Sequence, residues 1–208
     1  SFAEFTSTLA TAEATEWKDA WATFCSGEKS WALNQDQLST THPIVAPIND
    51  LNDTYVNFDG ITYAKGASVL KQLVAYVGRS EFFEGINHYL YRHAYSNATL
   101  NDLLTELEGT SGRDLKTWSA QWLEQAGINT IATDLHTAQD GTISELTLHQ
   151  FAPTDHPVLR EHRLAVGFYN EDEESGKVVR TDRIELDVAG EATTVTGAAS
   201  KPRPQFLL

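Results

Sequence analysis

The stretch "FDGITYAKG", residues 58–66, places side chains that could do chemistry at the start of a helix. Thr62 is a good N-cap, which puts Tyr63 at the first helical position, where backbone N–H groups are free and the helix dipole favours negative charge. A phenol there can donate a hydrogen bond to an oxyanion. A structural tyrosine packed under a helix start has the same pattern, so the residues alone leave both interpretations open.

The other residues of catalytic types form no recognisable motif. His88 and His93 are five residues apart, about 140° around a helix, so they do not share a face as an i, i+4 zinc pair does. Three more histidines are irregularly spaced: His149, His156 and His162. We find no His-Glu-x-x-His, no glycine-rich phosphate loop, no Cys-x-x-Cys and no nucleophile elbow. Taken alone, the chain contains no complete active site.

Helical periodicity dominates up to residue 127. Thr62 and Gly78 bound the clearest helix, whose apolar face is formed by Ala67, Leu70, Val74 and Val77, with Val69 and Leu73 beside them. A second helix is predicted from Ser80 through Leu90. Thr99 with Asp102 predicts a capping box for a helix that Gly109 ends, and Asp114 caps a further helix that ends at Gly127. Residues 1–14 and 30–38 also have helical patterns.

After residue 128 the apolar residues recur at a period of two. Strands are predicted over residues 142–151, 162–170 and 177–188, separated by turn signals such as Asp140-Gly141 and the acidic run 171–174. The sequence thus predicts an α+β, multidomain chain: an all-helical lobe over residues 1–127, followed by a small antiparallel β-sandwich over 128–208. The absence of an internal repeat disfavours a helical solenoid.

Composition limits the possible partners and compartments. The 208 residues carry a net charge of -14, which makes nucleic acid and anionic membrane surfaces poor partners. Cys25 is the only cysteine, and no apolar run approaches the roughly 20 residues that span a bilayer. A reducing, cytoplasmic compartment fits this composition. The opening "SFAEF" has no methionine, so we expect a piece of a longer polypeptide.

The first 127 residues resemble the second half of the thermolysin-like catalytic domain of the aminopeptidase N family of zinc metallopeptidases. The resemblance rests on Tyr-x-Lys-Gly at residues 63–66, on "FFEGINHYLYRHAYSNATLNDLLTELEGTSGRDLKTWSAQWLEQAG" further along, and on "TTHPI" at residues 40–44. "SFAEF" resembles the segment that follows the third zinc ligand of the family. Residues 128–208 resemble the β-sandwich after the catalytic domain, and "RPQFLL" resembles the strand that leads to a C-terminal helical domain.

The resemblance implies a function for the parent protein: a zinc-dependent aminopeptidase that hydrolyses N-terminal residues from peptides. It assigns to Tyr63 the stabilisation of the tetrahedral oxyanion and to Phe58 a wall of the pocket for the substrate's first side chain. Many relatives have tyrosine at the position of Phe58. Lys65 and Gly66 are expected to be scaffold, the lysine exposed or paired. The zinc ligands and the general base lie upstream by this resemblance, so we expect the fragment alone to bind no zinc and to be inactive.

Two non-catalytic interpretations compete with this one. The chain could be a binding or interaction module of helices plus β-sandwich, which a buried Tyr63 with its hydroxyl bonded to the backbone would favour. It could also be a helical scaffold in which the sandwich is an inserted partner site, although the missing repeat disfavours this. The partners implied by the enzymatic interpretation are peptide substrates and the remaining domains of the same polypeptide.

Overall fold

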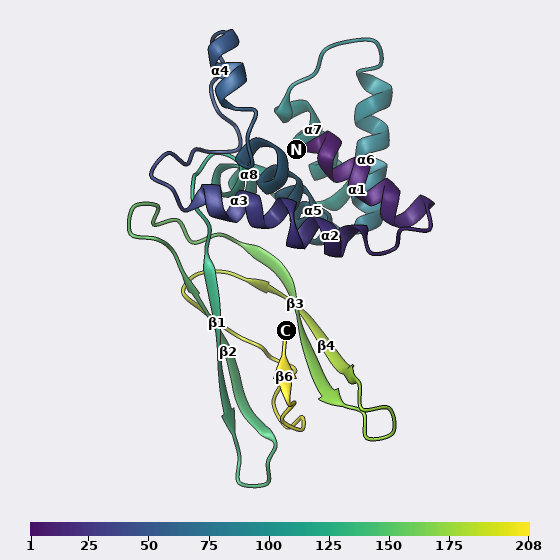
Figure 1. Ribbon diagram of the computed structural model, residues 1–208, viewed down its shortest axis with the longest axis vertical. Coiled ribbons are helices and arrows are strands. Elements are labelled where there is room, and N and C mark those ends of the chain that lie inside the picture. Colours follow the sequence, from purple (N-terminus) through teal and green to yellow (C-terminus); the bar gives the residue numbers. More distant parts are fainter. The chain divides into compact units, whose positions relative to one another are not determined.

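The computed structural model describes residues 1–208, which separate into two compact units. The helical unit comprises residues 1–128 and 153–158, and the β unit comprises 129–152 and 159–208. Helices occupy the first part of the chain and antiparallel strands the second (Figure 1). The predicted α+β class, helices followed by a small β-sandwich, is confirmed.

The helical unit is built around α5 (Gly66–Val77), which a π-helical turn, η1 (Ile61–Lys65), precedes without a break. The predicted apolar face of this helix is largely buried, with Ala67, Leu70 and Val77 inside the core and Val74 packed against it. Gly78 ends the helix as predicted, with φ at +100°. The other helices are α1 (Phe2–Ala14), α2 (Ala20–Ser26), α3 (Glu28–Asp36), α4 (Leu51–Val56), α6 (Arg79–Arg92), α7 (Leu100–Ser111) and α8 (Leu115–Trp122).

Two predicted helix ends were wrong. The capping box of Thr99 and Asp102 is present, but α7 continues past Gly109 and ends at Gly112, a left-handed residue with φ at +67°. The extension beyond Gly109 is stabilised by the Thr110 hydroxyl, which donates to the Glu81 carbonyl of α6 at 2.8 Å. Helix α8 ends at Trp122 rather than at Gly127.

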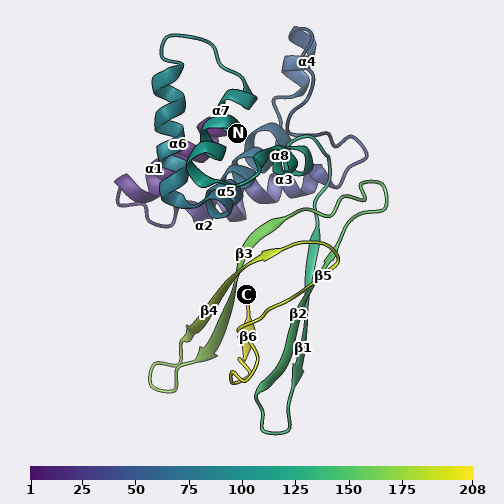
Figure 2. The same cartoon turned by 180° about the vertical axis from the view of Figure 1, so that it is seen from behind.

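Two short helices were not predicted. Helix α2 lies between α1 and α3, and α4 stands apart from the other helices of its unit at the end of an extended connection (Figures 1 and 2). Helix α4 has only six residues and none of them is buried, so it is too short to show a clear helical period. Its sequence signal is local instead, because the Asp50 carboxylate caps it by accepting the Asp53 N–H.

The β unit consists of two antiparallel three-stranded sheets, ordered β1-β2-β5 and β4-β3-β6. Its strands are β1 (Thr130–Thr137), β2 (Ile143–Phe151), β3 (His162–Glu171), β4 (Val178–Val188), β5 (Ala192–Thr194) and β6 (Phe206–Leu207). Figure 2 shows the two long hairpins, β1 with β2 and β3 with β4. Both sheets contribute to one apolar core, which contains Ile143, Leu146, Leu148, Val166, Phe168, Val188, Val195 and Ala198.

A bulge explains the imperfect alternation of β2. Thr137 pairs with Ile143 and His136 with Glu145, so Ser144 is an extra residue in the ladder. The extra residue lets Ile143 and Leu146, three positions apart, both lie in the core. Strands β1 and β5 were not predicted, because β1 is largely exposed along its length and β5 has only three residues. Strand β6 lies within "RPQFLL", where the resemblance implied a strand.

Candidate functional site

Tyr63 lies inside the π-helical turn η1, not at the first position of a regular helix. The predicted N-cap, Thr62, is wrong: the capping side chain is Asp59, whose Oδ1 accepts the Thr62 N–H at 2.9 Å. The Tyr63 N–H is itself bonded to the Asp59 carbonyl at 3.0 Å. Tyr63 therefore has no free backbone donor, and only its side chain remains available for chemistry.

The Tyr63 side chain lies next to Phe58. The two ring centroids are 5.7 Å apart and the ring planes are tilted by 46°. Phe58 is 63% exposed and Tyr63 is half-buried. No group of the chain accepts or donates a hydrogen bond at the Tyr63 hydroxyl. The turn thus presents a phenol that keeps its hydrogen-bonding capacity, beside an accessible aromatic surface.

The Asp59 carboxylate is held from two other segments. Gln35 of α3 donates from Nε2 to Asp59 Oδ2 at 2.5 Å, and its Oε1 accepts the Gly60 N–H at 2.8 Å. His42 Nε2 lies 2.7 Å from the same Asp59 Oδ2, and its Nδ1 lies 2.7 Å from the Pro43 carbonyl. His42 is the histidine of "TTHPI", so this loop lies against the turn that carries Tyr63.

Gly60 is needed for this close approach. A Cβ on residue 60 would lie 2.9 Å from Gln35 Oε1 and 3.1 Å from the Trp31 ring. At both distances the Gln35 side chain or the Trp31 ring would have to move to make room for the Cβ. The glycine therefore lets α3 pack directly on the start of η1.

The first residue of the chain contacts the other side of the same turn. The Ser1 hydroxyl donates to the Thr62 carbonyl at 2.5 Å. Gly66 faces Ser1 so closely that a Cβ there would collide with the Ser1 side chain. Ser1 and the start of α1 are thus packed against the turn that carries Tyr63, although they are about sixty residues away in sequence.

Lys65 is buried and paired. Its ammonium lies 2.8 Å from Asp36 Oδ2 and 3.0 Å from Oδ1, and it donates to the Gly127 carbonyl at 3.0 Å. The Thr41 hydroxyl donates to the same Asp36 carboxylate at 2.6 Å. Lys65 side-chain exposure is 6% and that of Asp36 is 1%. These contacts make Lys65 part of the scaffold that joins η1, α3 and the segment after α8.

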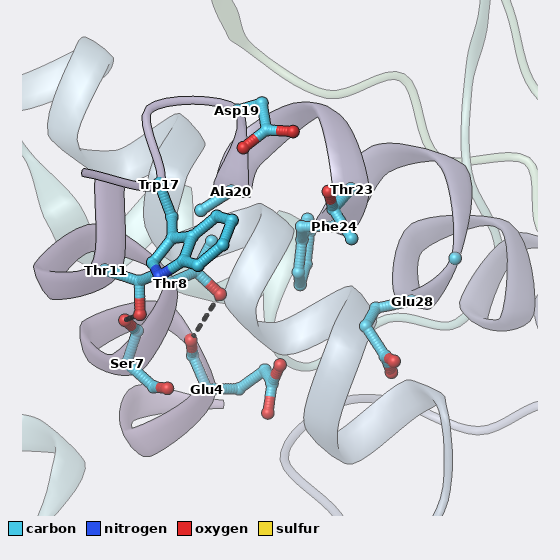
Figure 3. Close-up of a pocket in the computed structure, with 11 residues that line it drawn as sticks. Glu4, Ser7, Thr8, Thr11, Trp17, Asp19, Ala20, Thr23, Phe24 and Glu28 are labelled. Carbon is cyan, nitrogen blue, oxygen red and sulfur yellow. Dashed lines mark hydrogen bonds between the residues drawn. The ribbon is translucent and has the colours of Figure 1, made fainter. Parts of the chain in front are cut away.

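One open groove of the helical unit lies between α1, α2 and the start of α3 (Figure 3). Trp17 and Phe24 contribute apolar surface to it, and Glu4, Asp19 and Glu28 also line it. Thr8 donates its hydroxyl to the Glu4 carbonyl at 3.0 Å, a bond within α1. The groove contains neither Tyr63 nor Phe58, so it is separate from the predicted site.

Two of the histidines lie next to polar side chains of their own unit. His88 Nδ1 lies 3.9 Å from a Glu106 carboxylate oxygen, and His162 Nε2 lies 2.9 Å from Gln150 Oε1. No three His, Cys, Asp or Glu side chains gather in a way that could hold a metal ion. The 208 residues therefore do not fit a zinc site of their own.

None of the helices is both long and apolar enough to cross a membrane.

The sequence comparisons identify the family. The model described as "Peptidase family M1 domain" matches residues 1–122, and the chain belongs to this family. It is 54% identical over 205 residues to a protein named Aminopeptidase N from Streptomyces lividans, a match that covers 96% of this chain and 24% of that protein. The predicted membership in the aminopeptidase N family is confirmed.

Two further relatives match more than half of the chain. A protein named Leucyl aminopeptidase from Saccharolobus solfataricus is 39% identical over 127 residues, covering 61% of this chain and 16% of the relative. One named Tricorn protease-interacting factor F2 from Thermoplasma acidophilum is 35% identical over 151 residues, covering 73% and 19%. The chain thus spans about a quarter or less of the length of these curated relatives.

Proposed function

We propose that this chain is a segment of a zinc-dependent aminopeptidase, in which Tyr63 stabilises the tetrahedral oxyanion formed when an N-terminal residue is removed from a peptide. Residues 1–127 form a lobe of the catalytic domain and residues 128–208 form a β-sandwich domain. The observation that carries the proposal is the state of Tyr63: its backbone is fixed by Asp59, while its hydroxyl has no hydrogen-bond partner in the chain.

The family relationship supports a peptidase. Relatives with 54% and 39% identity are named aminopeptidases, but they are at least four times longer than their matched parts, so activity belongs to the longer protein. Zinc has no ligand set among these residues, and the proposal assigns its ligands to other parts of that protein. The contact of Ser1 with Thr62 agrees with this, because by the resemblance Ser1 directly follows a zinc ligand.

The phenol acts on charge that develops at the substrate carbonyl. When the carbonyl carbon becomes tetrahedral, its oxygen gains negative charge, and the Tyr63 hydroxyl donates a hydrogen bond to it. A donor fixed in advance pays no reorganisation cost at that moment. Because the bond is stronger in the transition state than in the bound substrate, it raises kcat rather than lowering KM.

Phe58 supplies an apolar wall for the first side chain of the substrate. Its ring is 63% exposed and lies beside the Tyr63 ring, so a substrate placed at the phenol also reaches this surface. Phenylalanine offers no hydroxyl, and the recognition it gives is apolar contact alone. A cytoplasmic setting agrees with the single cysteine, Cys25, which is exposed and free.

An interaction module without chemistry is the alternative. That interpretation predicts a buried Tyr63 whose hydroxyl is hydrogen-bonded to the backbone, as in structural tyrosines. Tyr63 is half-buried, and its hydroxyl makes no such bond. We therefore favour the catalytic interpretation.

The test is a comparison of Tyr63→Phe with the unmodified enzyme, in the full-length polypeptide that carries this segment, on one aminoacyl anilide. Loss of an oxyanion donor predicts a kcat lower by about 10²- to 10³-fold with little change in KM. Tyr95→Phe is the matched control, because Tyr95 is a fully exposed tyrosine of the same unit. If Tyr63→Phe keeps kcat within about threefold of the unmodified enzyme, a difference of only ~0.6 kcal/mol in barrier, the assignment of Tyr63 is wrong.

A further inference from the structure

Asp59 differs from an ordinary helix cap in where its hydrogen-bond partners come from. An ordinary capping aspartate in this unit, Asp114, accepts the Lys116 and Thr117 N–H groups and the Thr117 hydroxyl, all from its own helix. Asp59 accepts the Thr62 N–H with one oxygen, and its other oxygen contacts Gln35 and His42, which lie 24 and 17 residues away. The carboxylate therefore joins three separate segments at the start of η1.

The position of Asp59 couples this cluster directly to Tyr63. The Asp59 carbonyl accepts the Tyr63 N–H at 3.0 Å, and the carboxylate of the same residue accepts the N–H of Thr62 at 2.9 Å. The two bonds fix the peptide groups on the N-terminal side of the Tyr63 Cα. Loss of the carboxylate bond would free the Thr62 peptide group, which directly precedes Tyr63, and so change the direction in which the phenol leaves the turn.

His42 and Gln35 fix the rotation of Asp59. The Asp59 side chain is only 13% exposed and that of His42 is 22% exposed, so water replaces these bonds poorly. Both His42 nitrogens face acceptors, the Pro43 carbonyl and the Asp59 carboxylate. The ring is thus held at both nitrogens, one against its own loop and one against Asp59. Gln35 is oriented in turn by the Gly60 N–H, which its carbonyl oxygen accepts.

We propose that Asp59, held by His42 and Gln35, is the positioning residue for the Tyr63 phenol. This inference rests on the proposed function of Tyr63. Asp59 touches neither substrate nor reacting atoms in this account, and acts only through the direction of Tyr63. The cost of a misdirected donor falls on the transition state, since a displacement of about 1 Å in a positioned group can lower a rate by about 10²-fold.

A double-mutant cycle tests the inference in the full-length enzyme with its metal bound. Asp59→Asn keeps the size of the side chain but turns an amide N–H₂ toward donors. We expect a kcat lower by about 10- to 100-fold with KM within about threefold. When Asp59→Asn is added to Tyr63→Phe, kcat should fall by less than about threefold further, because no hydroxyl is left to position.

A second variant and a control complete the design. His42→Phe keeps a ring at position 42 but removes both contacts, and it should lower kcat in the same manner, so it carries the test if Asp59→Asn does not fold. Asp114→Asn weakens a cap of the same chemistry on α8 and should leave kcat unchanged.

The two proposals fail in different ways. If Tyr63→Phe lowers kcat but Asp59→Asn and His42→Phe do not, or if their losses multiply fully with that of Tyr63→Phe, the positioning role is overturned and the function of Tyr63 stands. If Tyr63→Phe leaves kcat unchanged, the proposed function fails and this inference fails with it.

Discussion

In the proposed function, two tasks fall to two neighbouring aromatic side chains, Tyr63 and Phe58. One has a hydroxyl without a partner in the chain, and the other has a ring that is mostly exposed. The four residues between Phe58 and Tyr63 include the capping Asp59 and the close-packed Gly60, so the pair is fixed by the turn itself. A change in either ring should therefore affect function with little effect on folding.

Phe58→Ala tests the apolar wall. Removing the ring should lower kcat/KM on a leucyl anilide by about 5- to 10-fold more than on an alanyl anilide, since about 1 kcal/mol of apolar contact is lost only with the larger side chain. The melting temperature should not change, because the ring is exposed. Tyr91→Ala, at a position 85% exposed on α6, is the control. Equal losses on the two substrates would show that Phe58 does not contact the first side chain.

The buried pair of Lys65 and Asp36 makes a prediction about stability. Lys65→Met removes the cation from the buried Asp36 carboxylate, to which the Thr41 hydroxyl still donates, and this should lower the free energy of unfolding by about 3–5 kcal/mol. The exposed pair of Arg79 and Glu13 is the matched comparison, where Glu13→Gln should cost at most about 1 kcal/mol.

Urea denaturation followed by tryptophan fluorescence measures both variants. All five tryptophans lie in the helical unit, so the signal reports on the unit that contains both pairs. The double variant Lys65→Met with Asp36→Leu should regain much of the loss, because no unpaired charge remains buried. A cost below about 1 kcal/mol for Lys65→Met alone would mean that water or another group compensates Asp36.

At the scale of elements, the sequence predicts the helices and strands that have a clear apolar period or a local cap. It does not predict element bounds that depend on polar contacts with other segments. The buried face of α5, the capping box of α7 and the Asp114 cap of α8 were all predicted from local pattern. Strand β1 was missed because only Ile131 and Leu135 pack toward the core. Helix α7 continues past Gly109 because the Thr110 hydroxyl donates a hydrogen bond to α6. Local helix propensity does not reveal such a contact.

The Asp59 cap had a sequence signal that was overlooked. Asp59 stands three residues before Thr62, the spacing at which a capping carboxylate meets a backbone N–H. Thr62 is also a good capping residue, and the pattern alone does not choose between them. Gln35 and His42 could not be predicted as partners, because they come from other segments and only the packing of α3 and the following loop brings them to Asp59.

In the β unit, His162 predicts a pH dependence of stability. Burial, and then the positive charge of Arg160, lowers the pKa of His162 from 6.5 to about 4. Between these values the unfolded chain binds a proton that the folded chain does not, so stability is highest above pH 6.5 and falls as the pH drops toward 4. We expect a loss of about 1–3 kcal/mol over this interval.

Amide NMR signals of β3 and β4, followed through urea titrations at pH 7.5, 6 and 4.5, measure this loss within the β unit. His162→Gln removes the titrating ring and retains a donor for Gln150 Oε1, which His162 Nε2 now contacts at 2.9 Å. This variant should have a flatter dependence on pH. An equally steep dependence in the variant would assign the effect to other groups.

At the scale of the whole molecule, family membership and fold class follow from the sequence, but the location of an intact active site does not. The chain spans 24% of the length of its Streptomyces relative, and no metal-binding cluster lies among its residues. In the proposed function, the chain contributes a hydrogen-bond donor, the Tyr63 phenol, on a turn that contacts Asp59 on one side and Ser1 on the other. The activity is to be measured on the longer protein.

The most direct measurement is the affinity of the full-length enzyme and its Tyr63→Phe variant for a phosphinic dipeptide, whose tetrahedral anionic centre mimics the oxyanion. If Tyr63 donates to that oxygen, the variant should bind the mimic about 10²- to 10³-fold more weakly, in parallel with its loss of kcat/KM, while KM for the substrate changes by less than about threefold. Tyr95→Phe should bind the mimic normally. Affinity of the Tyr63→Phe variant within about threefold of the unmodified enzyme would contradict the account.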